Sequence, residues 1–264
     1  MKVESFKDIL YEKEDTTGIV TITLNRPHKM NTFNKAMFSG LNAAMARFRD
    51  DETAGVAIIT AAGDGAFSAG LDIDAGTALV NGGDLSETSA FELNFLSDDM
   101  DGKPVVFACF GHCVGQAAAL GGWADIRIAA DDTLISLPEA KIGISAVALP
   151  GLLVDLLGGS QASYALLYGG ALDANWGLRA GFFHEVVARD ALQARARAVA
   201  LEMMKQAPLA LHAHKKLVRA ALSEPRDEVI AKGQAHRQIT LNSRDFREGM
   251  AAFLEKRPAQ FEGR

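Results

Sequence analysis

Two glycine-rich segments of the sequence place small residues where backbone amide groups could bind a ligand. The first, GDGAFSAGLDI, covers residues 63–73, and the second, FGHCVGQAAALGGWAD, covers residues 110–125. Each follows an apolar, strand-like run, and the second has no ionisable side chain between Gly115 and Asp125. The first turn of a helix exposes unpaired N–H groups at the positive end of its dipole. Amides from two such turns could together stabilise an oxyanion that develops during a reaction.

A glutamate that follows the second segment is the candidate acid or base. Glu139 lies in SLPEAKIGI, directly after Pro138, and the apolar run ISAVALPGLL follows at residues 144–153. Apolar surroundings would raise its pKa towards the working pH of a proton-transfer group. A structural role is the alternative, because a glutamate in this position is also favoured at the start of a helix. The glycine-rich segments have a similar alternative as tight turns, and the first lacks the spacing of a phosphate-binding loop.

Other polar residues near these segments are expected to have structural roles. Asp72 would fix its turn by hydrogen bonds between its side chain and the backbone, and Asp125 would begin the next strand. His112 is expected to be packed or exposed, without a catalytic role. Cys109 and Cys113 cannot complete a four-ligand zinc site, so we expect buried, reduced thiols in a cytoplasmic protein and no metal site.

The elements that position these segments alternate between strands and helices. Apolar, β-branched runs predict strands at residues 19–25, 55–63 and 103–111, and two more within ADIRIAAD and TLISLPE. Apolar residues at helical spacing predict an amphipathic helix over residues 35–51. This alternation favours parallel strands over a hairpin sheet, and the chain from about residue 150 onward is predicted to be mostly helical. Residues 74–90 have the composition of a surface loop.

The composition excludes several classes of partner. The 264 residues carry a net charge of -6, which argues against nucleic acid because phosphate binding needs a basic surface. The charged N-terminal sequence MKVESFKDILYEKED lacks the apolar core of a signal peptide. No apolar run approaches the ~20 residues that span a bilayer, so no membrane partner is expected.

These segments, taken in order, resemble the crotonase superfamily, also called the enoyl-CoA hydratase/isomerase family. The matching pieces are LNRPHKMN, GAFSAGLDI, KPVVFACFGHCVGQAAALGGWADIRIAADDTLISLPEAKIGI and REGMAAFLEKRPAQF. They cover the chain nearly end to end. The resemblance implies an α/β fold, a crotonase-like spiral of ββα units. It also implies a core over residues 1–200 and a helical C-terminal trimerisation region over residues 201–264.

The resemblance also implies a role for individual residues. Relatives hold the carbonyl oxygen of an acyl-CoA thioester with two backbone N–H groups, which would here belong to Leu71 and Gln116. Many relatives have glycine at the second position, but only the amide is needed there. Hydratases of the family use two glutamates, and this chain has Ala119 at the first position and Glu139 at the second.

A single glutamate favours a shift of a double bond, as in Δ3-Δ2 enoyl-CoA isomerases, with Glu139 carrying the proton between C2 and C4. The alternatives are an enoyl-CoA hydratase, or another reaction of the superfamily such as hydrolysis, dehalogenation or decarboxylation. A non-catalytic member that binds CoA or RNA is a further alternative, although the acidic composition disfavours RNA and the presence of Glu139 disfavours an inactive site.

The ligand implied by the resemblance is an acyl-CoA substrate, with coenzyme A as part of it and no separate cofactor. Lys256 near the C-terminus is a candidate phosphate or ribose contact, because the C-terminal helix of relatives closes over a site that often belongs to a neighbouring subunit. Relatives form trimers that often pair into hexamers, so a homotrimer or hexamer is expected. The remaining CoA contacts would come from two short segments and comprise His28, Lys29, Met30, Ala69, Leu71, Asp72 and Ile73.

Overall fold

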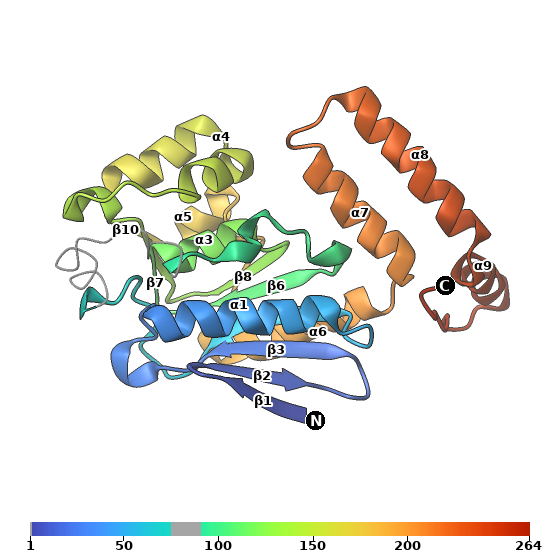
Figure 1. Cartoon of the computed structure of the whole chain (residues 1–264), viewed down its shortest axis with the longest axis horizontal. Helices are drawn as coiled ribbons and strands as arrows, with labels where there is room; N and C mark the ends of the chain where they lie inside the picture. The colour runs from blue at the N-terminus through green and yellow to red at the C-terminus, as the bar shows by residue number, and fades with distance from the viewer. Residues whose placement is uncertain (1, 75–90) are drawn as a thin grey trace.

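Residues 2–74 and 91–264 are described by the computed structural model, and within them two β-sheets are covered by helices (Figure 1). The predicted loop at residues 74–90 lies outside the described residues, except for Asp74. The larger sheet has seven strands in the order β1-β2-β3-β4-β6-β8-β11, and β3 to β11 in this order run parallel. Its strands are β1 (Lys2–Phe6), β2 (Ile9–Lys13), β3 (Ile19–Leu24), β4 (Val56–Ala61), β6 (Val105–Cys109), β8 (Ile126–Ala130) and β11 (Glu185–Val187).

The first two strands escape the sequence analysis. Strands β1, β2 and β3 are antiparallel neighbours, so the sheet begins with a meander and is parallel only from β3 onward. In β2, Ile9 and Tyr11 are buried while the residues between and after them are partly exposed. This is the period-2 pattern of a half-buried strand. Charged residues alternate with the apolar ones in this region. The N-terminal sequence was therefore interpreted only as polar, and the strand pattern was missed.

The smaller sheet consists of four strands of three residues each, in the order β10-β9-β7-β5. Strands β5 and β7 run parallel, with Ala66 opposite His112 and Ser68 opposite Cys113. Both glycine-rich segments therefore contain a short strand before the turn. Because the two strands are parallel, both turns begin at the carboxyl-terminal end of the pair. Its strands are β5 (Ala66–Ser68), β7 (His112–Val114), β9 (Leu134–Ser136) and β10 (Ala171–Asp173).

The helices of the N-terminal part bury one face against the sheets. Helix α1 (Lys35–Asp50) begins at Asn34, whose side chain accepts a hydrogen bond from the Met37 amide, and it packs on β1, β2 and β3. Helix α6 (Leu192–Met204) packs on β4, β6 and β8. The other α-helices are α3 (Gln116–Trp123), α4 (Leu149–Tyr168), α5 (Ala174–Ala180), α7 (Pro208–Ala220), α8 (Arg226–Asn242) and α9 (Arg244–Glu255). The short 3₁₀ helices are η1 (Pro27–Lys29), η3 (Asn94–Ser97), η4 (Met100–Gly102), η5 (Glu139–Ile142) and η6 (Arg189–Ala191).

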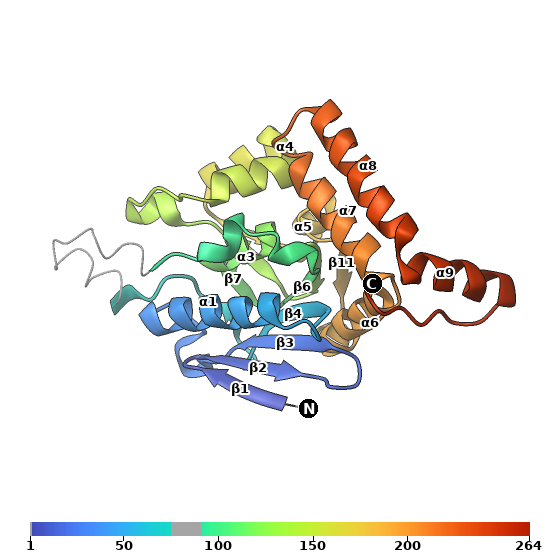
Figure 2. The ribbon, with the colours of Figure 1, turned by 45° about the vertical axis from the view of Figure 1, so that its right-hand side comes forward.

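The last three helices form an arm beside the sheets. Helix α7 lies next to the core, α8 packs on the outer side of α7, and α9 lies farthest from the sheets (Figures 1 and 2). Helix α8 has no buried residue in the single chain. Within residues 2–74 and 91–264, no helix is both long and apolar enough to cross a lipid bilayer. Large apolar side chains of α8 and α9 are exposed, among them Ile230, Ile239, Phe246, Met250, Phe253 and Leu254.

Two buried lysines join α1, β6 and α7. The Lys103 ammonium donates to the backbone oxygens of Phe48, Arg49 and Asp51 at distances of 3.1, 2.8 and 2.7 Å. The carbonyls of Phe48 and Arg49 belong to the last turn of α1, and that of Asp51 to the residue that follows it, where few backbone donors remain. Lys215 of α7 donates to the Lys103 carbonyl at 2.8 Å. Burial lowers the pKa of both ammonium groups.

Lys103→Met should therefore lower the free energy of unfolding by about 2 kcal/mol, because buried carbonyls would lose a charged donor. Urea denaturation followed by circular dichroism measures the loss. Lys216→Met is the matched control, since Lys216 forms a surface ion pair with Asp101, which is 71% exposed. This control should stay within about 0.5 kcal/mol of wild type. Equal stabilities of the two variants would contradict the capping role of Lys103.

Candidate active site

The turns that follow β5 and β7 lie against each other. Gly70 has a φ of +86°, and a Cβ built on it would lie 3.2 Å from the carbonyl oxygen of Val114. Such a contact is tighter than side chains normally tolerate, and the left-handed backbone also favours glycine. The close approach of Gly70 to Val114 places Leu71 and the start of α3 side by side. The structure therefore brings together the two segments whose amides the sequence analysis selected.

The backbone around Leu71 is held by a strand-like bridge to Phe33. The Phe33 amide donates to the Gly70 carbonyl at 2.8 Å, and the Asp72 amide donates to the Phe33 carbonyl at 3.0 Å. In a parallel bridge of this kind, Phe33 bonds to the residues on either side of Leu71. The N–H of Leu71 consequently points to the opposite side, away from Phe33.

Helix α3 begins directly after Gly115, which has a φ of +55°. The Gly115 amide donates to the Ser136 carbonyl at 2.9 Å, and its carbonyl accepts from the amides of Ala118 and Ala119 at 2.9 and 3.2 Å. The N–H groups of Gln116 and Ala117 precede these bonds and have no acceptor within the helix. Because α3 has no acidic residue in its first turn, the positive end of its dipole has no counter-charge within the helix.

The carboxyl group of Glu139 lies at this helix start. Its Oε1 atom is 2.7 Å from the position that a Cβ of Gly115 would occupy, so any other residue at 115 would displace it. Its Oε2 atom is buried and has no hydrogen-bond partner among the described residues. Burial raises the pKa of Glu139 above its usual value. A carboxyl group with a raised pKa and an oxygen that lacks a partner can exchange a proton nearer neutral pH than an ordinary glutamate.

No second carboxylate follows on α3 at the position considered in the sequence analysis. Ala119 is 2% exposed and lies one helical turn after Gly115. A methyl group therefore occupies this place in the core beside the turn. The arrangement offers backbone donors from two turns and one proton acceptor, and it could stabilise a negatively charged oxygen while a neighbouring proton is moved.

The structure gives the other polar residues near the turns structural contacts. The Asp72 carboxylate accepts from Arg26 at 2.6 Å and from the Asp74 amide at 3.0 Å. Asp125 accepts from the Val105 amide and from Lys215, both at 2.8 Å. These contacts agree with the turn-fixing role expected for Asp72 and with the structural role expected for Asp125. Arg26, in contrast, was given no role in the sequence analysis, although it lies in the quoted motif LNRPHKMN.

The segment expected to bind CoA lies beside the first turn. Residues 27–30 form the turn η1 and a left-handed Met30, whose carbonyl accepts from the Ala69 amide at 3.0 Å. His28, Lys29 and Met30 are exposed, and so is Ile73. This part of the predicted contact set is therefore contiguous and open to a ligand.

Lys256 is not brought to this site within one chain. It is exposed and ends α9, whereas the turns lie at the opposite side of the molecule, near the start of α3 and the end of β7 (Figures 1 and 2). A contact between Lys256 and a ligand at the turns would need a second copy of the chain.

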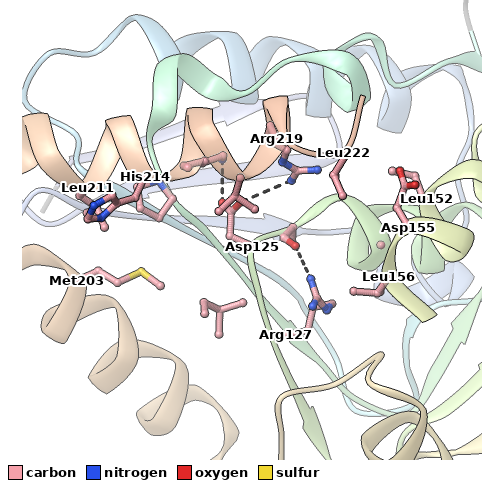
Figure 3. Close-up of a pocket in the computed structure, with 16 residues that line it drawn as sticks. Asp125, Arg127, Leu152, Asp155, Leu156, Met203, Leu211, His214, Arg219 and Leu222 are labelled. Carbon is pink, nitrogen blue, oxygen red and sulfur yellow. Dashed lines mark hydrogen bonds and ion pairs between the residues drawn. The ribbon is translucent and has the colours of Figure 1, made fainter. Parts of the chain in front are cut away.

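A cavity of about 410 Å³ lies elsewhere (Figure 3). It opens beside Pro104 and Ile126, at the starts of β6 and β8, whereas β7 and the second turn come after the end of β6. Two of its charged residues, Lys215 and Arg219, face Asp125 at 2.8 and 3.5 Å. The cavity is therefore separate from the two turns, and much of its charge is already paired.

Comparison with known proteins identifies the family. The sequence profile of the enoyl-CoA hydratase/isomerase family matches residues 14–264. The chain belongs to this family. The matched range of this family member includes both turns, Glu139 and all three C-terminal helices.

Individual relatives agree over nearly their whole length. The family member described here is 34% identical to a carnitinyl-CoA dehydratase of Citrobacter koseri, over 93% of this chain and 95% of the relative. It is 31% identical to a probable enoyl-CoA hydratase of Mycobacterium bovis, over 97% of this chain and 98% of the relative. A crystal structure of an enoyl-CoA hydratase/carnithine racemase from Magnetospirillum magneticum is 30% identical and superposes with a TM-score of 0.88, covering 98% of this chain and 97% of that one. The crotonase-like fold expected from the sequence is confirmed.

The raised pKa of Glu139 predicts how Glu139→Gln changes stability with pH. A carboxyl group whose pKa is raised in the folded state favours folding below the unfolded value of about 4.5 and loses this contribution as the pH rises through the folded value. Glu139→Gln should therefore be more stable than wild type at pH 8, and this advantage should shrink towards pH 4. Urea denaturation across this range measures the difference.

Glu14→Gln is a control for which the opposite change in stability is expected at pH 8. The side-chain hydrogen bond from Arg197 lowers the pKa of Glu14, so its carboxylate stabilises the fold above the unfolded value and loses this contribution as the pH falls. Glu14→Gln should be less stable than wild type at pH 8. A Glu139→Gln variant that follows the same course as Glu14→Gln would contradict a half-buried Glu139 carboxylate whose pKa is raised.

Proposed function

We propose that this protein shifts the double bond of an enoyl-CoA thioester between Δ3 and Δ2, with Glu139 as the proton carrier. The observation that supports the proposal most is the position of the Glu139 carboxyl group. It lies against Gly115, it has one buried oxygen without a partner among the described residues, and its pKa is raised by burial. Ala119 supplies no second carboxylate beside it.

The proposed reaction begins with the thioester oxygen between the amides of Leu71 and Gln116. Glu139 removes a proton from C2 of a 3-enoyl-CoA, and the electrons of that C–H bond move onto the thioester to form a conjugated enolate. The two amides stabilise the oxygen charge, an effect for which one donor is typically worth about 10²–10³ in rate. The protonated Glu139 then returns the proton to C4, which leaves the double bond between C2 and C3.

A raised pKa suits both halves of this cycle. A carboxylate of ordinary pKa is a weak base, whereas one whose pKa is raised by burial accepts a proton more readily. After the transfer Glu139 is neutral, and the buried site no longer holds an unpaired charge. The protonated, neutral Glu139 stays beside the enolate until it returns the proton.

Hydration or dehydration is the second candidate. It is favoured by the relatives, since two of those that match over the whole chain are named a dehydratase and a probable hydratase. Hydration needs water to be activated at C3 and a proton to be delivered at C2, two tasks that Glu139 alone would have to perform. Other superfamily reactions, including hydrolysis and decarboxylation, and a non-catalytic CoA-binding role, have no specific observation in their favour.

Glu139→Gln should reduce isomerisation by about 10²–10⁴-fold, because an amide cannot accept the C2 proton. The measurement is the growth of the conjugated thioester absorbance from 3-enoyl-CoA substrates of several chain lengths, with 3-hydroxyacyl-CoA followed in parallel. For wild type, kcat/KM should rise with pH through a value above 4.5, since only the carboxylate form is active.

Glu185→Gln is the control, because Glu185 is paired with Arg195 on the surface. It should retain wild-type activity. Hydration of 2-enoyl-CoA that exceeds isomerisation in wild type would overturn the isomerase assignment in favour of the second candidate. CoA binding without turnover would favour the non-catalytic one.

We also propose that residues 201–264 form a helical region through which the chain assembles into a homotrimer or a hexamer. The exposed apolar side chains of α8 and α9 support this, since patches of this kind mark contact surfaces. A neighbouring copy could also bring Lys256 to the ligand. The free, buried thiols of Cys109 and Cys113 support a reducing compartment such as the cytoplasm.

The double substitution Phe253→Asp with Leu254→Asp should reduce the assembly to monomers. The two side chains are 79% and 76% exposed in the single chain, so charge there should leave the fold intact while opposing burial in an interface. Light scattering after size exclusion measures the mass. Arg247→Ala, an exposed change on the same helix, should keep the wild-type mass. A monomeric wild type, or an unchanged mass of the double variant, would contradict the proposal.

A further inference from the structure

An arginine outside both turns contacts the residue next to Leu71. The Nη1 atom of Arg26 lies 2.6 Å from Oδ2 of Asp72 and 2.7 Å from Oγ1 of Thr32. The same nitrogen lies 3.2 Å from the backbone oxygen of Thr32. Thr32 Oγ1 in turn donates to Asp72 Oδ2 at 3.1 Å. Arg26 and Asp72 are separated by 46 positions in the sequence, so this contact joins two segments that only the fold brings together.

The ion pair is largely removed from solvent. The side chains of Arg26 and Asp72 are 13% and 7% exposed. A charge-assisted hydrogen bond is stronger when solvent is excluded, and loss of one partner of a buried pair destabilises the other. Asp72 without Arg26 would therefore tend to move towards water.

Any movement of Asp72 is transmitted to Leu71 through the backbone. The amide of Asp72 donates to the Phe33 carbonyl at 3.0 Å, and the Gly70 carbonyl accepts from the Phe33 amide at 2.8 Å. Thr32, the second contact of Arg26, directly precedes Phe33. Arg26 thus contacts both chain segments of the bridge that orients Leu71. Its own backbone is fixed as well, since its amide donates to Oδ1 of the buried Asn31 at 2.8 Å.

We propose that Arg26 is a positioning residue that holds the Leu71 amide in the direction needed to bind a thioester oxygen. This inference rests on the proposed function, because it assigns Arg26 to the same oxyanion site. Arg26 touches neither the substrate nor the reacting atoms. It acts through the Asp72 carboxylate and through Thr32.

Replacement of Arg26 should lower kcat and leave KM nearly unchanged. A donor displaced by a fraction of an ångström still allows the CoA part of the ligand to bind, but it stabilises the enolate less well. Arg26→Gln should therefore lower kcat by about 10–100-fold, since misplacement by about 1 Å can cost 10²-fold. KM should stay within about threefold of wild type. Arg26→Lys should recover part of the loss, because an ammonium keeps the charge and the donors of Nη1 but lies one bond nearer the backbone than Nη1 does.

Two spectroscopic measurements separate positioning from a general structural effect. The first is the infrared stretch of a ¹³C-labelled thioester carbonyl in bound 2-enoyl-CoA, which moves to lower frequency as hydrogen bonds to the oxygen strengthen. The second is the ¹⁵N–¹H signal of Leu71 in ligand-free protein labelled with ¹⁵N-leucine, assigned by its loss in Leu71→Ile. Arg26→Gln should return the carbonyl stretch towards the value of free ligand and should shift the Leu71 signal.

Lys13→Gln is the matched control. Lys13 pairs with Asp51 at 2.8 Å, and the two side chains are 12% and 8% exposed, almost as for Arg26 and Asp72. Lys13 ends β2 opposite Val20 near the start of β3, whereas Arg26 follows the end of β3. Lys13→Gln should lose comparable stability in urea denaturation and should leave both spectroscopic signals at their wild-type values.

The outcomes distinguish failure of this inference from failure of the proposed function. A Leu71 signal that is unchanged in Arg26→Gln, or that changes equally in Lys13→Gln, overturns the positioning role. A wild type that polarises no thioester carbonyl overturns the oxyanion site, while the Leu71 signal still decides whether Arg26 orients that amide. A wild type that hydrates in place of isomerising overturns only the reaction assignment, because both reactions would use the same amides.

Discussion

The candidate site depends on the parallel pairing of two three-residue strands, β5 and β7. This pairing sends two turns out of the same sheet edge, and Gly70 then lies in contact with Val114. The donors at the site are backbone groups, so their directions are set by the sheet and by the start of α3, without side-chain freedom. The cost is conformational: Gly70 and Gly115 both have a positive φ, and a side chain at either would collide with the opposite turn or with Glu139. The close approach of the two turns therefore depends on these glycines.

The charged groups of the core have close partners, whereas one oxygen of Glu139 at the candidate site has none among the described residues. Asp51, Asp125, Lys103 and Lys215 are largely or partly buried, and each has charged or carbonyl partners within about 3 Å. Glu139 instead has a buried oxygen without a partner among the described residues. Such a group destabilises the fold when charged, and proteins tend to keep such groups where they are useful. This contrast is a physical observation that supports the proton-transfer role proposed for Glu139.

The reaction proposed for the single carboxyl group differs from the activities in the names of two relatives. Similarity over 93–97% of the chain assigns the fold and the family, but the names of those relatives are those of hydratases and dehydratases. The local chemistry at Ala119 and Glu139 points in another direction. Fold-level similarity and site-level chemistry answer different questions, and a shared oxyanion site can serve several reactions with different acid and base groups.

The sequence by itself determined the long, strongly patterned features. Residues 19–25, 55–63 and 103–111 were predicted as strands because they are apolar, β-branched runs, and 35–51 as a helix because its apolar residues recur at helical spacing. The two turns could be selected because glycines follow strand-like runs, and Glu139 because its segment resembles the enoyl-CoA hydratase/isomerase family. Strands β1 and β2 were not predicted because charged residues alternate with their apolar ones, and β5 and β7 because only three residues lie between glycine-rich turns. Only the tertiary structure decided that Arg26 meets Asp72, that Glu139 faces Gly115, and that Lys256 lies far from both turns. These relations join residues many positions apart, and their distances depend on strand pairing and packing, which no local pattern encodes.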